Sequence, residues 1–146
     1  MSAIVVDASV AVKWVLDEED ADAALSLHGL DLTAPSLWLL EAASVLWRRS
    51  KTGEFSNARA EEMLADLHDA PIETTPLEED LGTALAIANL IGHPVYDCLY
   101  LAAAIRLGTF VVTADKRFLT AARRSDFSNK VKLLAVDYPT GVELSS

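Results

Sequence analysis

Short apolar runs rich in β-branched residues alternate along the chain with longer segments of helical composition. The clearest runs are 4–6 (Ile-Val-Val) and 110–112 (Phe-Val-Val). Such brief, continuously apolar strands are typical of a parallel sheet that is buried on both faces. The helical segments between them supply the right-handed crossovers that a parallel sheet requires. The alternation therefore predicts a three-layer α/β fold, with a parallel sheet covered by helices on both faces.

Glycine, proline and capping residues indicate where the remaining segments begin and end. Gly29, Gly53 and Gly108 each follow a helical stretch, as glycines at helix C-termini do. The chain of 146 residues shows no repeat, low-complexity tract or linker, so we expect one domain, 1–146. The predicted strands are 4–6, 31–34, 72–75, 109–113 and 131–136, the predicted helices are 8–16, 18–28, 36–51, 56–69, 78–91, 96–107 and 116–124, and an appended segment follows from Tyr138.

Composition and charge limit the setting and the partners of the protein. No stretch reaches the ~18 uncharged apolar residues that a membrane span needs, and no basic segment precedes the first apolar run, so we expect neither an anchor nor a signal peptide. The single cysteine, Cys98, is compatible with a reducing cytoplasm. The formal net charge is −10, whereas nucleic-acid binders usually carry a basic surplus. An anionic substrate would therefore need metal ions to neutralise the acids around it.

Four acidic residues stand out because each is alone in an apolar segment or directly follows one. Asp7 ends the first strand, and Asp115 follows the strand at 109–113. Glu41 and Asp97 are the only charges across most of their predicted helices. A charged group is almost never buried alone, because an isolated ion in an apolar setting is very costly. Each acid therefore needs a cation, a hydrogen-bonding network or a metal ion.

The four acids have a structural interpretation and a chemical one. Asp7 alone is a preferred N-cap for the helix after it, and a network in which Arg or Lys pairs with the acids is the structural alternative for the set. If the strands before Asp7 and Asp115 are neighbours, however, the acids converge on one edge of the sheet. Such a cluster needs a counter-charge, which Mg²⁺ or Mn²⁺ supplies through its preference for oxygen ligands. The chemistry that this favours is phosphodiester hydrolysis.

The segments around these acids resemble the motifs of PIN-domain nucleases, and the resemblance covers nearly the whole chain. Within that family the chain looks most like the VapC-type ribonuclease toxins of prokaryotic toxin–antitoxin pairs. The similar stretches are Ile4-Val5-Val6-Asp7-Ala8-Ser9, Leu40-Glu41-Ala42, Tyr96-Asp97-Cys98-Leu99-Tyr100 and Thr113-Ala114-Asp115-Lys116-Arg117-Phe118.

The resemblance implies a metal-dependent endoribonuclease that uses Mg²⁺ or Mn²⁺ and acts as the toxin of a type II pair. It implies an RNA substrate, a cognate antitoxin protein, a homodimer, a cytoplasmic location and no membrane association. DNA cleavage, RNA processing and a non-catalytic interaction domain stay open as alternatives. The residues to which it assigns metal binding and catalysis are Asp7, Glu41, Asp97 and Asp115, with Ser9 and Thr113 in supporting roles.

Other residues have a less specific interpretation. The three histidines show no metal-ligand spacing, and His93 in particular is expected in a turn or on the surface. Leu81, Leu85 and Ala88 form a stripe at helical spacing, which predicts the inward face of the helix at 78–91. Basic residues on helices beside the acidic motifs either bind RNA phosphates or provide solvated surface charge; these are Arg48, Arg49, Lys116, Arg117, Arg123 and Arg124.

Overall fold

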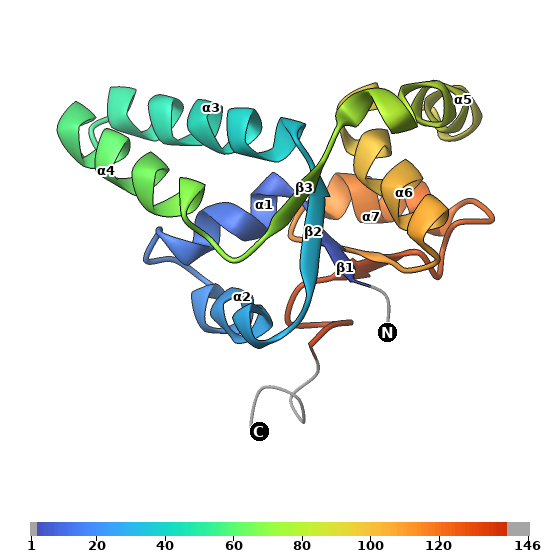
Figure 1. Ribbon diagram of the computed structural model, residues 1–146, viewed down its shortest axis with the longest axis horizontal. Helices are drawn as coiled ribbons and strands as arrows, with labels where there is room; N and C mark the ends of the chain where they lie inside the picture. The colour runs from blue at the N-terminus through green and yellow to red at the C-terminus, as the bar shows by residue number, and fades with distance from the viewer. Residues whose placement is uncertain (1–2, 140–146) are drawn as a thin grey trace.

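The computed structural model describes residues 3–139, and its strands alternate with helices as predicted. Within this range the strands are β1 (Ile4–Val6), β2 (Leu32–Pro35), β3 (Glu73–Thr75), β4 (Val111–Thr113) and β5 (Val131–Leu133). They form one parallel sheet in the order β3-β2-β1-β4-β5 (Figure 1). β1 is therefore central and pairs with β4, with Val5 opposite Val111. Most of the segment expected from Tyr138 onward, residues 140–146, lies outside the described residues.

The helices agree with the predicted ones except near the N-terminus. They are α1 (Ala8–Ala11), α2 (Ala21–Ser26), α3 (Leu37–Lys51), α4 (Asn57–His68), α5 (Leu81–Ile91), α6 (Val95–Leu107) and α7 (Lys116–Arg123). The helix expected at 8–16 gives way to a 3₁₀ turn at Val12–Trp14, in a stretch where valines lower helix propensity. The helix expected from Glu18 begins only at Ala21, because Asp20 adopts a left-handed conformation with φ of 67°.

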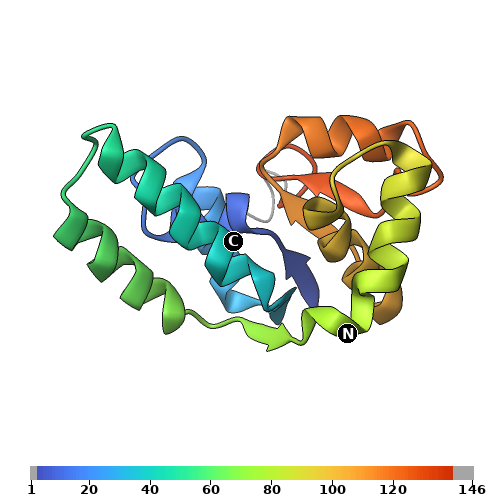
Figure 2. The same ribbon diagram turned by 90° about the horizontal axis from the view of Figure 1, so that it is seen from above.

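The sheet separates two apolar cores, to which β1 contributes alternately. Val5 packs into a core with residues of α3, α6 and α7, whereas Ile4 and Val6 face a second core that contains residues of α2. All three side chains are buried. Seen from above, α3 and α4 run along one side of the molecule and α5, α6 and α7 along the other, with β1 between them (Figure 2). Helices on both faces of a parallel sheet confirm the predicted three-layer α/β fold.

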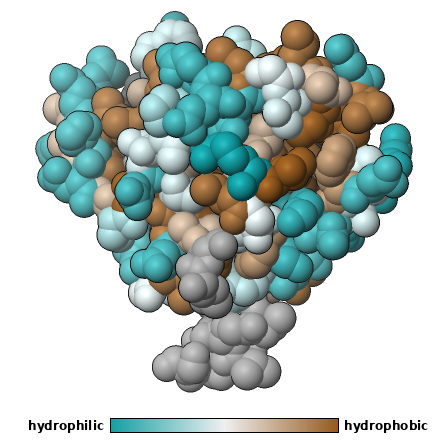
Figure 3. Space-filling view, turned by 45° about the vertical axis from the view of Figure 1, so that its right-hand side comes forward, coloured by the Kyte–Doolittle hydropathy of each residue, from teal (hydrophilic) through white to brown (hydrophobic). Residues whose placement is uncertain are grey.

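α5 turns a different face to the core from the one its leucines predict. Its buried residues are Ala84 and Ile87, and Ala88 packs against the core as predicted. Leu81 and Leu85 are instead 41% and 55% exposed, so the predicted inward stripe is wrong at both leucines. Most positions of α5 are apolar, and periodicity alone does not choose between its faces. Apolar surface gathers in the upper right of Figure 3, on the side of the molecule where α5 and α6 lie.

No helix within residues 3–139 is long and apolar enough to cross a membrane.

Candidate active site

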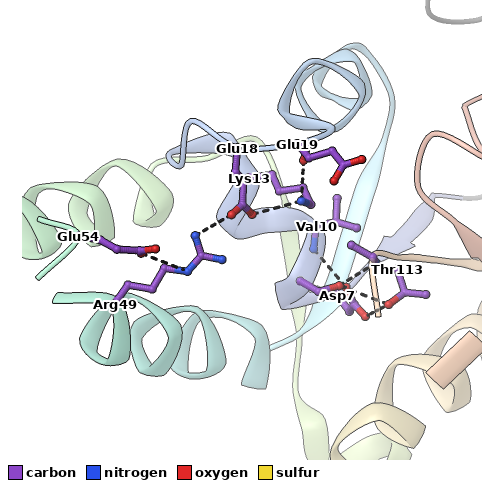
Figure 4. A network of polar contacts seen from close by, with 10 residues as sticks. Asp7, Val10, Lys13, Glu18, Glu19, Arg49, Glu54 and Thr113 are labelled. Carbon is purple, nitrogen blue, oxygen red and sulfur yellow. Dashed lines mark hydrogen bonds and ion pairs between the residues drawn. The ribbon is translucent and has the colours of Figure 1, made fainter. Parts of the chain in front are cut away.

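Asp7 directly follows the central strand, and its buried carboxyl group lies between two hydroxyls. The Ser9 hydroxyl donates to Oδ1 at 2.5 Å, and the Thr113 hydroxyl at the end of β4 donates to Oδ2 at 2.5 Å (Figure 4). The Val10 N–H also donates to Oδ1, at 3.3 Å, so Asp7 is the N-cap of α1. Asp7 therefore both caps α1 and lies at the carboxyl end of β1.

Burial dominates the electrostatics of Asp7. Removal from water raises the pKa of Asp7 from its ordinary value of 3.8 to about 7. The hydrogen bonds from Ser9 and Thr113 oppose this change, and the negative charge of Asp97 adds to it. A carboxyl group that is perturbed by burial and by a neighbouring acid is typical of functional sites.

Glu41 and Asp97 approach the same place from α3 and α6. The Tyr100 hydroxyl donates to Oε1 of Glu41, and Nε2 of His93 lies 2.6 Å from Oδ2 of Asp97. Burial raises the pKa of both carboxyl groups. The charge of Asp97 raises the pKa of Glu41 further, and the charge of Asp115 does the same to Asp97. The acids therefore interact electrostatically across the space between the two helices.

Asp115 follows β4 and is the N-cap of α7. Its Oδ1 accepts hydrogen bonds from the backbone N–H groups of residues 117 and 118, at 2.9 and 3.4 Å. Its own N–H donates to the Thr113 hydroxyl at 3.0 Å, and the N–H of Ala114 donates to the Ser9 hydroxyl at 2.8 Å. The two hydroxyls expected to support the acids thus join the end of β1 to the end of β4.

All four acids line one open pocket with a volume of about 520 Å³ between α3 and α6. The structure therefore brings together every acid that the sequence singles out. Ser9 also lines the pocket, whereas Thr113 lies behind Asp7 and is fully buried. The remaining wall of the pocket consists of Ala8, Leu37, Leu40, Ser44, Val45, Arg48 and Tyr96.

The structural alternative, in which arginine or lysine pairs with the acids, is not what the described residues show. Between residues 3 and 139 no lysine or arginine forms an ion pair with any of the four acids. Arg49, one turn from the pocket, instead binds Glu18 at 2.6 Å and Glu54 at 3.6 Å. Glu18 also forms an ion pair with Lys13. Figure 4 shows that this network of Lys13, Glu18, Arg49 and Glu54 lies apart from Asp7. Among the described residues, the four carboxyl groups are thus not paired with any lysine or arginine.

The donor set fits a hard divalent cation that keeps much of its water. In the described part of the chain no three acidic, histidine or cysteine side chains are gathered so closely that they could hold one ion. Mg²⁺ commonly binds through one or two carboxylates and retains several waters. Asp97 interacts electrostatically with both Asp7 and Asp115, and these acids line the same pocket, so they are the candidates for such pairs. A hydrated Mg²⁺ or Mn²⁺ ion fits this wide ring of oxygens better than a dehydrated ion would.

His93 and Tyr100 are residues of the site that the sequence interpretation missed. His93 does lie in the turn before α6, but its side chain is only 12% exposed and its ring stacks on Phe118. Tyr100 is fully buried. For Tyr100 the available signal was its spacing, because it lies three residues after Asp97 on α6 and therefore on the same helical face. His93 precedes α6, so helical spacing gave no such signal for it.

Fold and pocket together define a three-layer α/β protein with an acidic site at the carboxyl ends of its two central strands. The family profile described as the PIN domain matches residues 4–124. The chain therefore belongs to the PIN domain family, as the resemblance of its four motifs predicts.

Two relatives from Pyrobaculum aerophilum extend this assignment. The chain is 34% identical to ribonuclease VapC3 of that organism, over 78% of this chain and 90% of the relative. This similarity agrees with the predicted VapC type. The crystal structure of PAE2754 from the same organism has a similar fold, with a TM-score of 0.63, 22% identity and coverage of 82% of this chain and 84% of that one. At this identity the second likeness concerns the fold alone.

Proposed function

We propose that the protein is a metal-dependent endoribonuclease and the toxin of a type II toxin–antitoxin pair. The observation that carries this proposal is the convergence of Asp7, Glu41, Asp97 and Asp115, from four separate segments, on one pocket in which no described lysine or arginine forms an ion pair with them. Membership of the PIN domain family and the similarity to ribonuclease VapC3 support RNA as the substrate.

In this proposal the acids share the binding of Mg²⁺ or Mn²⁺. Asp7, Asp97 and Glu41 would hold the main ion, in part through the waters it retains, because no three of these described side chains gather closely enough to bind it directly. Asp115 would help to bind that ion or a second one. The bound cation supplies the positive charge that polarises the phosphate and activates water for an in-line displacement. To hold the ion, the Asp7 carboxyl group would need to be ionised, because carboxylate ligands bind metals in their deprotonated form. The hydroxyls of Ser9 and Thr113 then hold both oxygens of the Asp7 carboxylate in place.

Arg48 is the basic residue best placed to bind an RNA phosphate. It lines the acidic pocket, its side chain is exposed, and it forms no ion pair with the residues at 3–139. It lies seven residues beyond Glu41 on α3, about 10 Å along the helix axis. A phosphate next to the scissile one is therefore its expected partner. Such a contact positions RNA and does not read its sequence.

Cleavage assays with the isolated protein test the proposal. We expect cleavage of RNA in Mg²⁺ or Mn²⁺, none in the presence of chelator, and none of DNA. Asp7→Asn should abolish cleavage while circular dichroism shows an unchanged fold. Full activity of Asp7→Asn contradicts the site, and cleavage of DNA alone favours the other nuclease function.

We also propose an antitoxin partner, a homodimer and a cytoplasmic location. Leu81 and Leu85, which are exposed and one turn apart on α5, provide an apolar face that a second copy can cover. For the antitoxin, the expected result is growth arrest when the chain is expressed alone and recovery when a small neighbouring gene is expressed with it. Growth arrest that no neighbouring gene relieves contradicts this part of the proposal.

A further inference from the structure

Glu41 depends for its orientation on another helix, unlike two of the other acids. Asp7 and Asp115 are N-caps and accept hydrogen bonds from nearby backbone N–H groups. The Asp97 carboxylate contacts the His93 ring, which lies only four residues earlier in the chain. Glu41 lies inside α3, where backbone N–H groups are already bonded within the helix. Among the described residues, the donor that reaches its carboxylate is the Tyr100 hydroxyl of α6.

Tyr100 is well suited to hold this carboxylate still. Its side chain is fully buried, so the packed core fixes the position of its hydroxyl. It lies three residues after Asp97, so one helix carries both an acid of the pocket and the donor to a second acid. A glutamate side chain has three rotatable bonds and, without a partner, moves among many rotamers. A hydrogen bond to Oε1 leaves Oε2 available to the pocket that Glu41 lines.

We propose that Tyr100 is a positioning residue of the cation site, whose hydroxyl orients Glu41 so that one carboxylate oxygen stays directed at the bound ion. The inference rests on the proposed function only in that Glu41 takes part in cation binding. Groups that hydrogen-bond to metal-ligating side chains typically change metal affinity 10–100-fold when they are removed. Tyr100 therefore contributes to cation affinity without touching the cation.

Tyr100→Phe tests this, because the substitution removes the hydroxyl and keeps the buried ring. We expect the Mn²⁺ dissociation constant, measured by calorimetry without RNA, to rise about 10–100-fold. The unfolding transition in chelator should remain cooperative. Tyr138→Phe is the matched control, since the ring of Tyr138 packs on Phe110 at the opposite end of β4, and it should bind Mn²⁺ as the parent does.

A second pair of variants separates orientation of Glu41 from a general effect on the core. In a Glu41→Gln background, Tyr100→Phe should change the Mn²⁺ dissociation constant less than about twofold, because no carboxylate remains to be oriented. Equal losses in both backgrounds, parent-like affinity of Tyr100→Phe, or loss of its cooperative transition would each overturn the inference. A parent protein that binds Mn²⁺ but leaves RNA intact contradicts the proposed function instead, so the two failures are distinguishable.

Discussion

A carboxyl group buried at the end of a central strand lowers the stability of the fold whenever it ionises. Asp7 is in this position, and burial raises its pKa to about 7. Between about pH 4 and pH 7 the folded chain therefore binds more protons at this residue than the unfolded chain does. Stability without metal falls as the pH rises through this window. Each pKa unit corresponds to about 1.4 kcal/mol, so ionisation of Asp7 costs on the order of 4 kcal/mol.

Asp7→Asn should therefore stabilise the metal-free protein at high pH while it abolishes cleavage. The substituted side chain cannot ionise, and we expect a free energy of unfolding about 2–4 kcal/mol above that of the parent at pH 8. The difference should shrink as the pH falls to the ordinary pKa of 3.8, below which the Asp7 carboxyl group is mostly protonated in both states. Urea unfolding in chelator at several pH values measures it. A parent that is the more stable protein at pH 8 would contradict the burial argument.

At the scale of the element, α3 carries both a carboxylate and a cation toward the pocket. Arg48 lines the pocket, whereas the adjacent Arg49 is held by Glu18 and Glu54. Arg48→Ala should weaken RNA binding by a similar factor for all sequences and reduce the salt dependence of binding by about one phosphate contact. Arg49→Ala is the matched control and should cost about 1 kcal/mol of stability or less, with RNA binding unchanged. Filter binding at several salt concentrations measures both, and equal effects on binding would remove the special role of Arg48.

Sequence patterns were informative for those elements in which one feature is rare. A lone acid in an apolar helix is visible in one dimension, so Glu41 and Asp97 could be singled out before their neighbours were known. The orientation of α5 could not be predicted, since apolar residues occupy several of its faces. The contact between Tyr100 and Glu41 could not be predicted either, because it depends on how closely α3 approaches α6. A tyrosine in an apolar helix is also common in protein cores and does not by itself indicate a functional role.

At the scale of the whole molecule, the exposed leucines of α5 form an apolar surface that would be covered in a dimer but faces water in a monomer. Leu81 and Leu85, one turn apart on this helix, are 41% and 55% exposed. Leu85→Glu should therefore convert a dimer, with twice the mass of one chain by light scattering, into a monomer. Val136→Glu changes an equally exposed apolar residue after β5 and should leave the mass unchanged. A parent that is monomeric at micromolar concentration would contradict the proposed homodimer.

The pocket takes its acids from positions 7, 41, 97 and 115, and the bond between Thr113 and Asp7 exists only once β4 has joined β1. A growing chain therefore lacks the full set of acids until Asp115 has been synthesised and β4 has paired with β1. For an enzyme proposed to cleave RNA, this order of assembly means that a polypeptide still lacking Asp115 has no complete site with which to cut.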